Sequence, residues 1–402
     1  MATILSDVER TLERSGGLPL LIRLQIDDYC NIAHSCVLPI MELLCKQVHR
    51  WQMLCISGPM EIISSISRYT SVVDCGSPLL SSLILTGVKT GDESENDVFV
   101  SIGSPTAPLP APSYISTWGI KISPETWNFA QLRDLTLGVS AVFELVQILA
   151  ISPRLTSLTS SISCSHSNPT NAPAMLSSRE RVLDFSIVNL HMKSWQVHID
   201  YHGLFPRCTF PALEDLDCNI YPGPFTPGLR DFLARSQCPL TTMRLIIKCE
   251  EAEFIEILHL IPTLRDLDIT SNNISSHFFQ YLGETAIRSE NGPDFLPNLE
   301  TFQFQANQVS GLAFNWSLFR IMLPATTSAK GSKCRPLSKV TVHMHRSQVG
   351  NLTPAVQADL ASVIDDGLEI VGNYMYGDSG FNLLESLDPL QQALSRLRGS
   401  RR

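Results

Sequence analysis

The motif Leu-x-x-Leu-x-Leu recurs along most of this chain, with another apolar residue in place of leucine in some copies. The clearest copies begin at Leu132, Leu264 and Leu299, and successive copies from Leu213 through Leu240 to Leu299 start 24 to 35 residues apart. A unit that recurs at such a period cannot bury its apolar side alone, so it is stabilised by stacking on similar neighbours. The motif therefore predicts one long repeat array. Further copies begin at Leu21, Trp51, Leu80, Ile115, Leu155, Val182 and Leu337.

Each copy of the motif predicts a short β-strand. Alternate residues of a strand point to opposite faces, so the leucines of Leu-x-Leu point into the core and their neighbours point outward. Two copies, LRDLDITSNNI and LETFQFQANQV, continue to an asparagine, Asn272 and Asn307. We expect these side chains to be buried at the turn after the strand, where they can hydrogen-bond backbone groups that would otherwise be unpaired.

Segments with apolar residues at helical spacing separate several of these strands. Residues 141–153, 227–239 and 252–262 have this spacing, and each ends at a proline. The order strand, turn, helix and proline is typical of an α/β leucine-rich-repeat solenoid with a parallel concave β-sheet and convex helices. The alternative is a doubly wound α/β domain, but such domains usually carry a glycine-rich phosphate turn after an early strand, and the sequence has none.

Composition divides the chain into a repeat region and a tail. We expect residues 1–375 to form an irregular solenoid of about 11–12 repeats. Polar or proline-rich stretches near 87–113, 161–180 and 324–336 cannot build a core and predict loop insertions. Residues 376–402 end in a basic segment and predict a helix or tail that is partly disordered.

Charge and hydropathy exclude several classes of partner. The net charge is −9, from 39 acidic and 30 basic residues, so the chain as a whole does not attract nucleic acid. No apolar run reaches the roughly 18 residues of a membrane span, and the first residues do not resemble a signal peptide. We therefore expect no membrane partner and a cytoplasmic or nuclear location. The 11 cysteines are scattered without a Cys-x-x-Cys pair, which indicates free thiols.

The sequence contains no motif that is typical of catalysis. Nucleophile-elbow, zinc-protease, phosphate-loop and dinucleotide motifs are all absent, so we expect no enzyme, no catalytic residue and no cofactor. His191, His198 and His202 could belong to a metal site, but lone histidines more often have structural roles, and we assign no metal ligand. His343 and His345 are two residues apart on an expected strand and should both point outward.

The outward positions of the strands predict a binding surface on the concave face. In the middle of the array these positions are mainly acidic, whereas the first repeats offer Arg23 and Gln25. We hypothesise that this face binds a protein segment that carries lysine or arginine, because complementary charge helps to determine which partner binds. The alternative is that the charges only keep an exposed sheet soluble. The candidate binding residues are Asp134, Asp184, Asp215, Asp217, Asp266, Asp268, Gln303, Gln305 and His343.

Several short segments carry a family resemblance that covers nearly the whole chain. Arg14-Ser15-Gly16 precedes Pro19-Leu20, and His49-Arg50-Trp51 follows further along the chain. With LPNLETFQF and the closing segment 360–372, these resemble the leucine-rich-repeat region of F-box proteins from mushroom-forming fungi.

The resemblance implies the substrate-recognition part of a cullin-type ubiquitin ligase subunit. Members of the family usually carry an F-box before the segment that corresponds to Arg14-Ser15-Gly16, and we expect it to be missing here. A Skp-type adaptor and a cullin are therefore expected partners only if an F-box is supplied. The alternative is a stand-alone leucine-rich-repeat binding protein without a link to ubiquitin.

Overall fold

The computed structural model divides into two compact units, unit 1 (Met1–Ala212) and unit 2 (Leu213–Arg402). Each unit is an α/β structure with a parallel sheet, so the α/β class expected from the sequence is confirmed. The described residues are 2–26, 33–73, 77–88, 98–102, 109–122, 124–138, 142–161, 188–189, 194–198, 205, 208–220, 225–271, 274–286, 295–306, 335–345 and 368–375.

In unit 1 the strands of the main sheet follow one another in chain order, and every pair is parallel. Its strands are β1 (Leu20–Gln25), β2 (Trp51–Pro59), β3 (Ser82–Val88), β4 (Tyr114–Trp118), β5 (Asp134–Leu137), β6 (Ser157–Ser161) and β8 (Ser194–His198). The short strands β7 (Val188–Asn189) and β9 (Cys208–Thr209) pair separately. The helices are α1 (Ala2–Ser15), α2 (Ala33–Cys45), α3 (Met60–Ser71) and α4 (Val142–Ala150), with 3-10 turns η1 (Val48–Arg50), η2 (Pro124–Thr126) and η3 (Phe129–Gln131).

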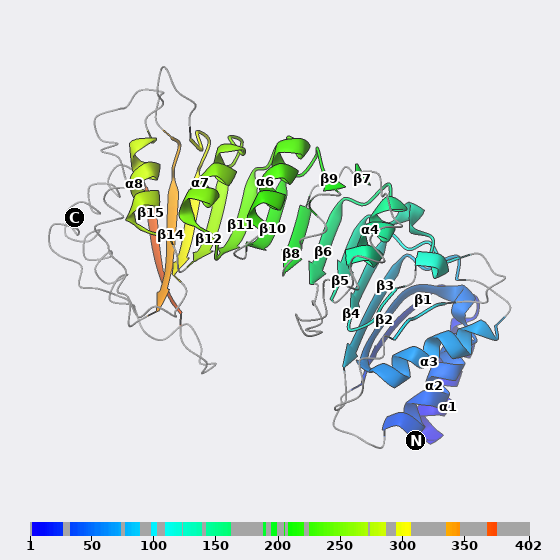
Figure 1. Cartoon of the computed structure of the whole chain (residues 1–402). Helices are drawn as coiled ribbons and strands as arrows, with labels where there is room; N and C mark the ends of the chain where they lie inside the picture. The colour runs from blue at the N-terminus through cyan, green and yellow to red at the C-terminus, as the bar shows by residue number, and fades with distance from the viewer. Residues whose placement is uncertain are drawn as a thin grey trace, which may run out of the picture. The chain divides into compact units, whose positions relative to one another are not determined.

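Unit 2 has the same construction, and all of its described strands belong to the main sheet. Its parallel strands, again in chain order, are β10 (Asp215–Ile220), β11 (Thr242–Ile247), β12 (Asp266–Ser271), β13 (Thr301–Ala306), β14 (Lys339–His345) and β15 (Glu369–Met375). The helices α6 (Phe225–Ser236), α7 (Glu251–His259) and α8 (Ser276–Glu284) lie beside one another in the same order (Figure 1). The helices expected within 141–153, 227–239 and 252–262 correspond to α4, α6 and α7.

The two faces of each sheet differ because residues along a strand alternate in direction. In β12, Leu267 and Ile269 are buried, whereas Asp266 and Asp268 between them remain partly exposed. The buried side chains of α7, among them Phe254 and Ile257, lie on the side of the apolar positions. We call the other side, on which the residues between the buried ones lie, the open face.

The strand register was predicted correctly in most copies of the motif but not in β4. The first residue of the copy in β1, Leu21, was also expected to be buried and is exposed instead. The sequence placed Trp118 among the inward residues of a copy that begins at Ile115. In the structure, Ile115 and Thr117 are the buried positions, and 51% of Trp118 is exposed on the open face. A threonine at an inward position broke the apolar pattern on which the prediction depended.

Arg50, from the His-Arg-Trp segment, joins the end of α1 to the start of β2. Its Nε donates to the carbonyl oxygen of Leu18 at 2.9 Å, and its Nη2 donates to Oγ of Ser15 at 2.6 Å. The next residue, Trp51, is fully buried and donates from Nε1 to the carbonyl oxygen of Leu44 at 3.1 Å. The two segments that carry the family resemblance near the start of the chain therefore contact each other.

Arg335 has a corresponding role in unit 2, although the sequence placed it in the expected insertion 324–336. Its guanidinium donates to the carbonyl oxygens of Leu296 at 3.0 Å, Leu282 at 2.7 Å and Phe295 at 2.7 Å. Burial lowers the pKa of Arg335 to about 10, so the side chain is still charged at neutral pH. It supplies donors to the carbonyl of Leu282 in the last turn of α8, where a cation is favoured by the helix dipole, and to two carbonyls that follow the helix. This end of the expected insertion is thus part of the core.

The cysteines whose side chains the structure describes, such as Cys45 and Cys249, are free thiols, as the sequence indicated. Burial raises the pKa of Cys45 to about 12 and the pKa of Cys249 to about 11, so neither thiol is poised for reaction at neutral pH. Among the described helices, none is both long and apolar enough to span a bilayer.

Candidate interaction surface

The open face of unit 2 carries most of the candidate binding residues in rows that cross the strands. Parallel pairing places Asp215 beside Thr242, and Thr242 beside Asp266, and we call these three residues the first row. Two residues further along the same strands, Asp217, Arg244 and Asp268 form the second row. The side chains of both rows are partly exposed or exposed. The structure therefore brings together four of the aspartates that the sequence singled out.

Asp268 is the most constrained of these carboxylates. Nε2 of Gln303 on β13 donates to its Oδ2 at 2.9 Å, so two of the candidate residues are directly joined. Burial raises the pKa of Asp268, while the nearby charges of His343 and Arg244 act in the opposite direction. The second row therefore holds one positive residue between two negative ones and is not purely negative.

Arg244 is a residue that the sequence analysis missed, and it changes the charge pattern of the surface. The register places it between Asp217 on β10 and Asp268 on β12. The copy of the motif that begins at Leu240 has methionine at its second leucine position, and its outward residues were not among the predicted binding residues. Aligning TMRLII with DLDCNI and DLDITS would have shown one positive residue between two negative ones.

The remaining candidates of unit 2 lie on β13 and β14. Gln305 pairs in register with His343, which confirms that this histidine points away from the buried Val340 and Val342. At the other end of the face, Nζ of Lys339 lies 3.4 Å from Oε1 of Glu369, which compensates both charges.

Asp134 does not belong to this group, because it lies on β5 in unit 1, where its row neighbours are Tyr114 and Ser157. Several other residues that the sequence singled out lie outside the described residues or have no described side chain, so their roles stay predictions. They are Asp184, His191, His198, His202, Asn272, Asn307 and His345.

The open face of unit 1 has a different composition, because its strands β2 to β4 carry no charged residue there. The outward positions of β2 and β3 include Met53 and Ile84, and those of β4 are Tyr114, Ser116 and Trp118. Leu21 on β1 is 70% exposed. Gly138 makes room for the Trp118 ring, since a Cβ at this position would lie 2.6 Å from its Cδ2 atom.

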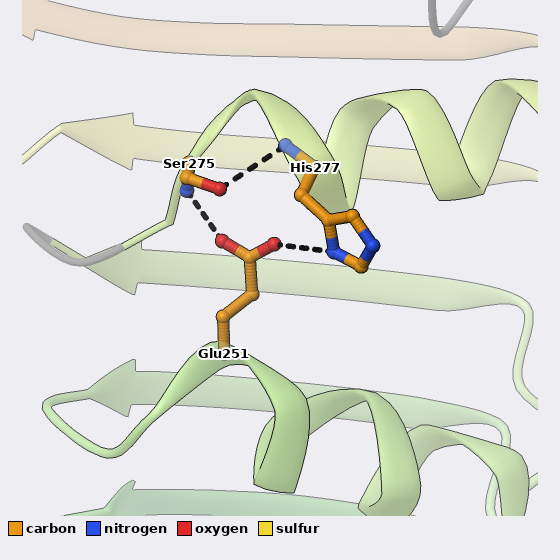
Figure 2. Close-up of polar contacts among 3 residues, drawn as sticks. All are labelled: Glu251, Ser275 and His277. Carbon is orange, nitrogen blue, oxygen red and sulfur yellow. Dashed lines mark hydrogen bonds and ion pairs between the residues drawn. The ribbon is translucent and has the colours of Figure 1, made fainter.

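On the helix side of unit 2, Glu251, Ser275 and His277 form a group that superficially resembles a catalytic triad (Figure 2). Oγ of Ser275 accepts from the backbone N–H of His277 at 3.1 Å, which is an ordinary helix cap at the start of α8. Glu251 accepts from the backbone N–H of Ser275 at 2.6 Å and lies 3.2 Å from Nδ1 of His277. The histidine ring contacts the carboxylate and not the serine hydroxyl, so the group joins α7 to α8 and activates no nucleophile.

The described residues contain no group of three or more histidine, cysteine, aspartate or glutamate side chains arranged to hold a metal ion. A scan of the chain against protein-family models finds no match, and a search of curated protein sequences finds none either. The geometry of the open faces is therefore the basis on which a function can be argued.

Proposed function

We propose that this protein is a leucine-rich-repeat solenoid that acts as a protein-interaction scaffold, with its open faces as the binding surfaces. The observation that carries the proposal is the repeated construction: within each unit, successive strands of the main sheet pair in parallel and in chain order. Among the described residues, many side chains of the open face, including those of both rows, are at least partly exposed. Repeat proteins commonly use such an extended sheet surface to bind partners. The family resemblance of the sequence supports a role in recognising substrates for a cullin-type ubiquitin ligase, with a stand-alone leucine-rich-repeat binding protein as the alternative.

The charge pattern of unit 2 supports a partner with basic side chains. Asp215, Asp217, Asp266 and Asp268 lie within two neighbouring rows, and Arg244 is the one basic residue inside those rows. Complementary charge mainly sets partner choice and association rate.

Affinity purification of the tagged full-length chain from its own cells, followed by mass spectrometry, tests the proposal. Specific protein partners are expected, and their loss when the four aspartates are replaced together by serine would support the open face of unit 2 as the binding surface. Replacing four acidic residues on helix surfaces, Asp7, Glu13, Asp231 and Glu256, gives a control with the same change in net charge.

A Skp-type adaptor and a cullin among the specific partners would support the ligase assignment. Other partners without these two proteins would instead support a stand-alone scaffold. Purification of the chain without any specific partner would contradict the scaffold proposal in both forms.

A further inference from the structure

We propose that the open face of unit 1 binds an extended peptide segment of a partner protein, with an acidic residue at Arg23 and an apolar residue between Tyr114 and Trp118. This inference rests on the proposed function, because it names the partner chemistry of one open face. It depends on a row of outward residues that crosses β1 to β5 in register, which we call the Arg23 row. The row consists of Arg23, Cys55, Ile84, Ser116 and Thr136.

Arg23 gives this row its only charge. The side chain is exposed, and within the described part of the chain its guanidinium forms no ion pair and no hydrogen bond. The other charged residue at the described outward positions of β1 to β6 is Asp134, which lies beside Tyr114 and repels a second carboxylate at that end. Because an arginine forms strong charge-assisted hydrogen bonds with a carboxylate, charge complementarity assigns an acidic residue of the partner to the β1 end.

Two aromatic side chains border the Arg23 row on β4. Tyr114 and Trp118 lie two residues before and two residues after Ser116, on the same face of the strand. Trp118 is exposed, and among the described residues neither its Nε1 nor Oη of Tyr114 has a hydrogen-bond partner. In contrast, Nε1 of the buried Trp127 donates to the carbonyl oxygen of Val100 at 3.2 Å. Accessible tryptophan and tyrosine side chains with a free donor are typical of the residues that dominate protein interfaces.

Trp118 is held in position before a partner arrives. A Cβ on Gly138 would lie 2.6 Å from Cδ2 and 2.7 Å from Cε3 of the indole, so the ring lies directly against the backbone of Gly138. This contact restricts the ring, while 51% of the residue stays accessible. An aromatic side chain that is already fixed loses little conformational freedom on binding, which favours affinity.

The spacing of the row determines which peptide fits. Neighbouring strands are about 4.8 Å apart, so Arg23 and Ser116, three strands from each other, start about 14 Å apart. An extended peptide advances about 3.4 Å per residue and therefore crosses this distance in about four residues. Residues four positions apart in an extended chain point to the same side, so both can face the sheet. The partner segment should thus carry its acidic and apolar residues four positions apart.

A selection from random heptapeptides displayed on phage, with the full-length chain as the target, tests the proposal. We expect the enriched peptides to share an aspartate or glutamate four positions from a proline, aliphatic or aromatic residue. The same peptides should bind weakly to Trp118→Ala, whose folding is checked by circular dichroism. Enrichment of peptides without a carboxylate, or no enrichment at all, would overturn the proposal.

A double-mutant cycle shows whether the carboxylate of a selected peptide contacts Arg23. Arg23→Gln in the protein, or glutamine in place of the acidic residue in the peptide, should each weaken binding about tenfold, because a charge-assisted hydrogen bond is lost. Since both changes remove the same contact, making them together should weaken binding no further. The control Arg10→Gln removes an exposed arginine from α1 and should leave the affinity unchanged. Additive effects in the cycle, or an equal effect of the control, would contradict the assignment.

The aromatic side chains and the spacing are tested with the same peptide. Trp118→Ala should weaken binding at least about tenfold, as loss of a central aromatic residue commonly does. The control Ile246→Ala removes an exposed apolar side chain from the open face of unit 2 and should have no effect. One glycine inserted between the acidic and the apolar residue turns the apolar residue to the other side of the peptide, so it should weaken binding as much as Trp118→Ala does. Undiminished binding of the lengthened peptide would refute the extended arrangement.

Other occupants of this face would give different results. If sedimentation shows a dimer of the full-length chain that Trp118→Ala dissociates, a second copy covers the face and the peptide proposal is wrong. A neutral glycan that binds to the wild type and to Arg23→Gln, but not to Trp118→Ala, would also overturn it.

The peptide proposal and the scaffold proposal can fail separately. If the chain retrieves proteins from its own cells but selects no peptide at the Arg23 row, the peptide proposal is wrong and the scaffold proposal stands. If selected peptides bind at the Arg23 row but the chain retrieves no protein, the scaffold proposal is wrong.

Discussion

Strand β3 of unit 1 and strand β12 of unit 2 turn similar residues toward their helices and different residues toward the open face. Leu83 and Leu85 occupy the buried positions of β3, as Leu267 and Ile269 do in β12. On the open face, β3 presents Ser82, Ile84 and Thr86, whereas β12 presents Asp266, Asp268 and Thr270.

The same contrast extends to the neighbouring strands. The outward residues of β2, β3 and β4 are uncharged, and those of β10, β11 and β12 include four aspartates and Arg244. Packing against helices restricts the inward positions to apolar side chains of suitable size. The outward positions are under no such restriction, so the two open faces can differ in charge while the inward faces stay alike.

The largest expected effect comes from removing the buried arginine of unit 2. Arg335→Met deprives several buried carbonyl oxygens of their donor, each at a cost of about 1–3 kcal/mol, so we expect a loss on the order of 3–5 kcal/mol. Hydrogen exchange read by mass spectrometry should show lost protection in β12 to β14 and retained protection in β2 to β4. The control Arg265→Met removes an exposed arginine and should leave both regions protected. An equal loss of protection in β2 to β4 would contradict this expectation, because it would mean that the two units unfold together.

A smaller effect is expected from Gly138→Ala, which disturbs the uncharged face of unit 1. The new Cβ would lie 2.6 Å from Cδ2 of Trp118 and 2.8 Å from its Cα, so the ring and strand β4 must shift. Overpacking of this kind costs about 1–3 kcal/mol in urea unfolding. Gly17→Ala is a matched control, since no atom lies within 4 Å of its new Cβ. Similar stabilities of the two variants would show that Trp118 is free to move.

The helix side of unit 2 should respond more weakly to change than the buried arginine does. Ser275→Ala removes the cap of α8, and loss of such a cap costs about 1 kcal/mol. Ser64→Ala, in the interior of α3, is the control, because its hydroxyl only donates to the carbonyl oxygen of Glu61 at 2.8 Å. The unfolding temperatures of the two variants measure this difference, and Ser275→Ala should unfold at the lower temperature. A loss in partner capture without a loss in stability would contradict the structural role assigned to Ser275.

The smallest effect concerns the charged face itself. Because burial raises the pKa of Asp268 in the folded chain above that in the unfolded chain, its ionised form costs stability at neutral pH. That cost disappears as the pH falls through the folded-state pKa. Asp268→Asn should therefore be slightly more stable than the wild type at pH 7, with the difference shrinking toward pH 4. Asp231→Asn, on an exposed helix face, controls for net charge. If the stability difference between Asp268→Asn and the wild type grew on acidification, the pKa of Asp268 would be lowered in the folded chain and not raised.

Much of the fold could be predicted because the inward positions repeat. The copies at Leu80, Leu213, Leu264 and Leu299 located strands β3, β10, β12 and β13, and the same alternation identified which side chains reach the open face. The prediction of β4 failed because Thr117 is buried at a position where the pattern requires an apolar residue. A local motif cannot show that neighbouring strands supply enough apolar contact to tolerate a hydroxyl.

The charge balance of the surface could be predicted only in part. The aspartates were recognisable from their own strands, but the effect of Arg244 depends on its register with two other strands. Arg335 was missed for a similar reason, because its partners Leu282 and Leu296 are 53 and 39 residues away in sequence. A single arginine beside a polar loop gives no local sign that it will be buried.

The agreement between strand order and chain order within each unit has a consequence for synthesis on the ribosome. Each strand from β2 to β6, and each from β11 to β15, pairs with a strand that has already emerged. At synthesis rates of roughly 5–20 residues per second, a new edge would be offered every few seconds, and the growing sheet could extend by one strand at a time. The nascent chain would then rarely wait for a distant segment, although its newest edge would stay open to incorrect pairing until the next strand arrives.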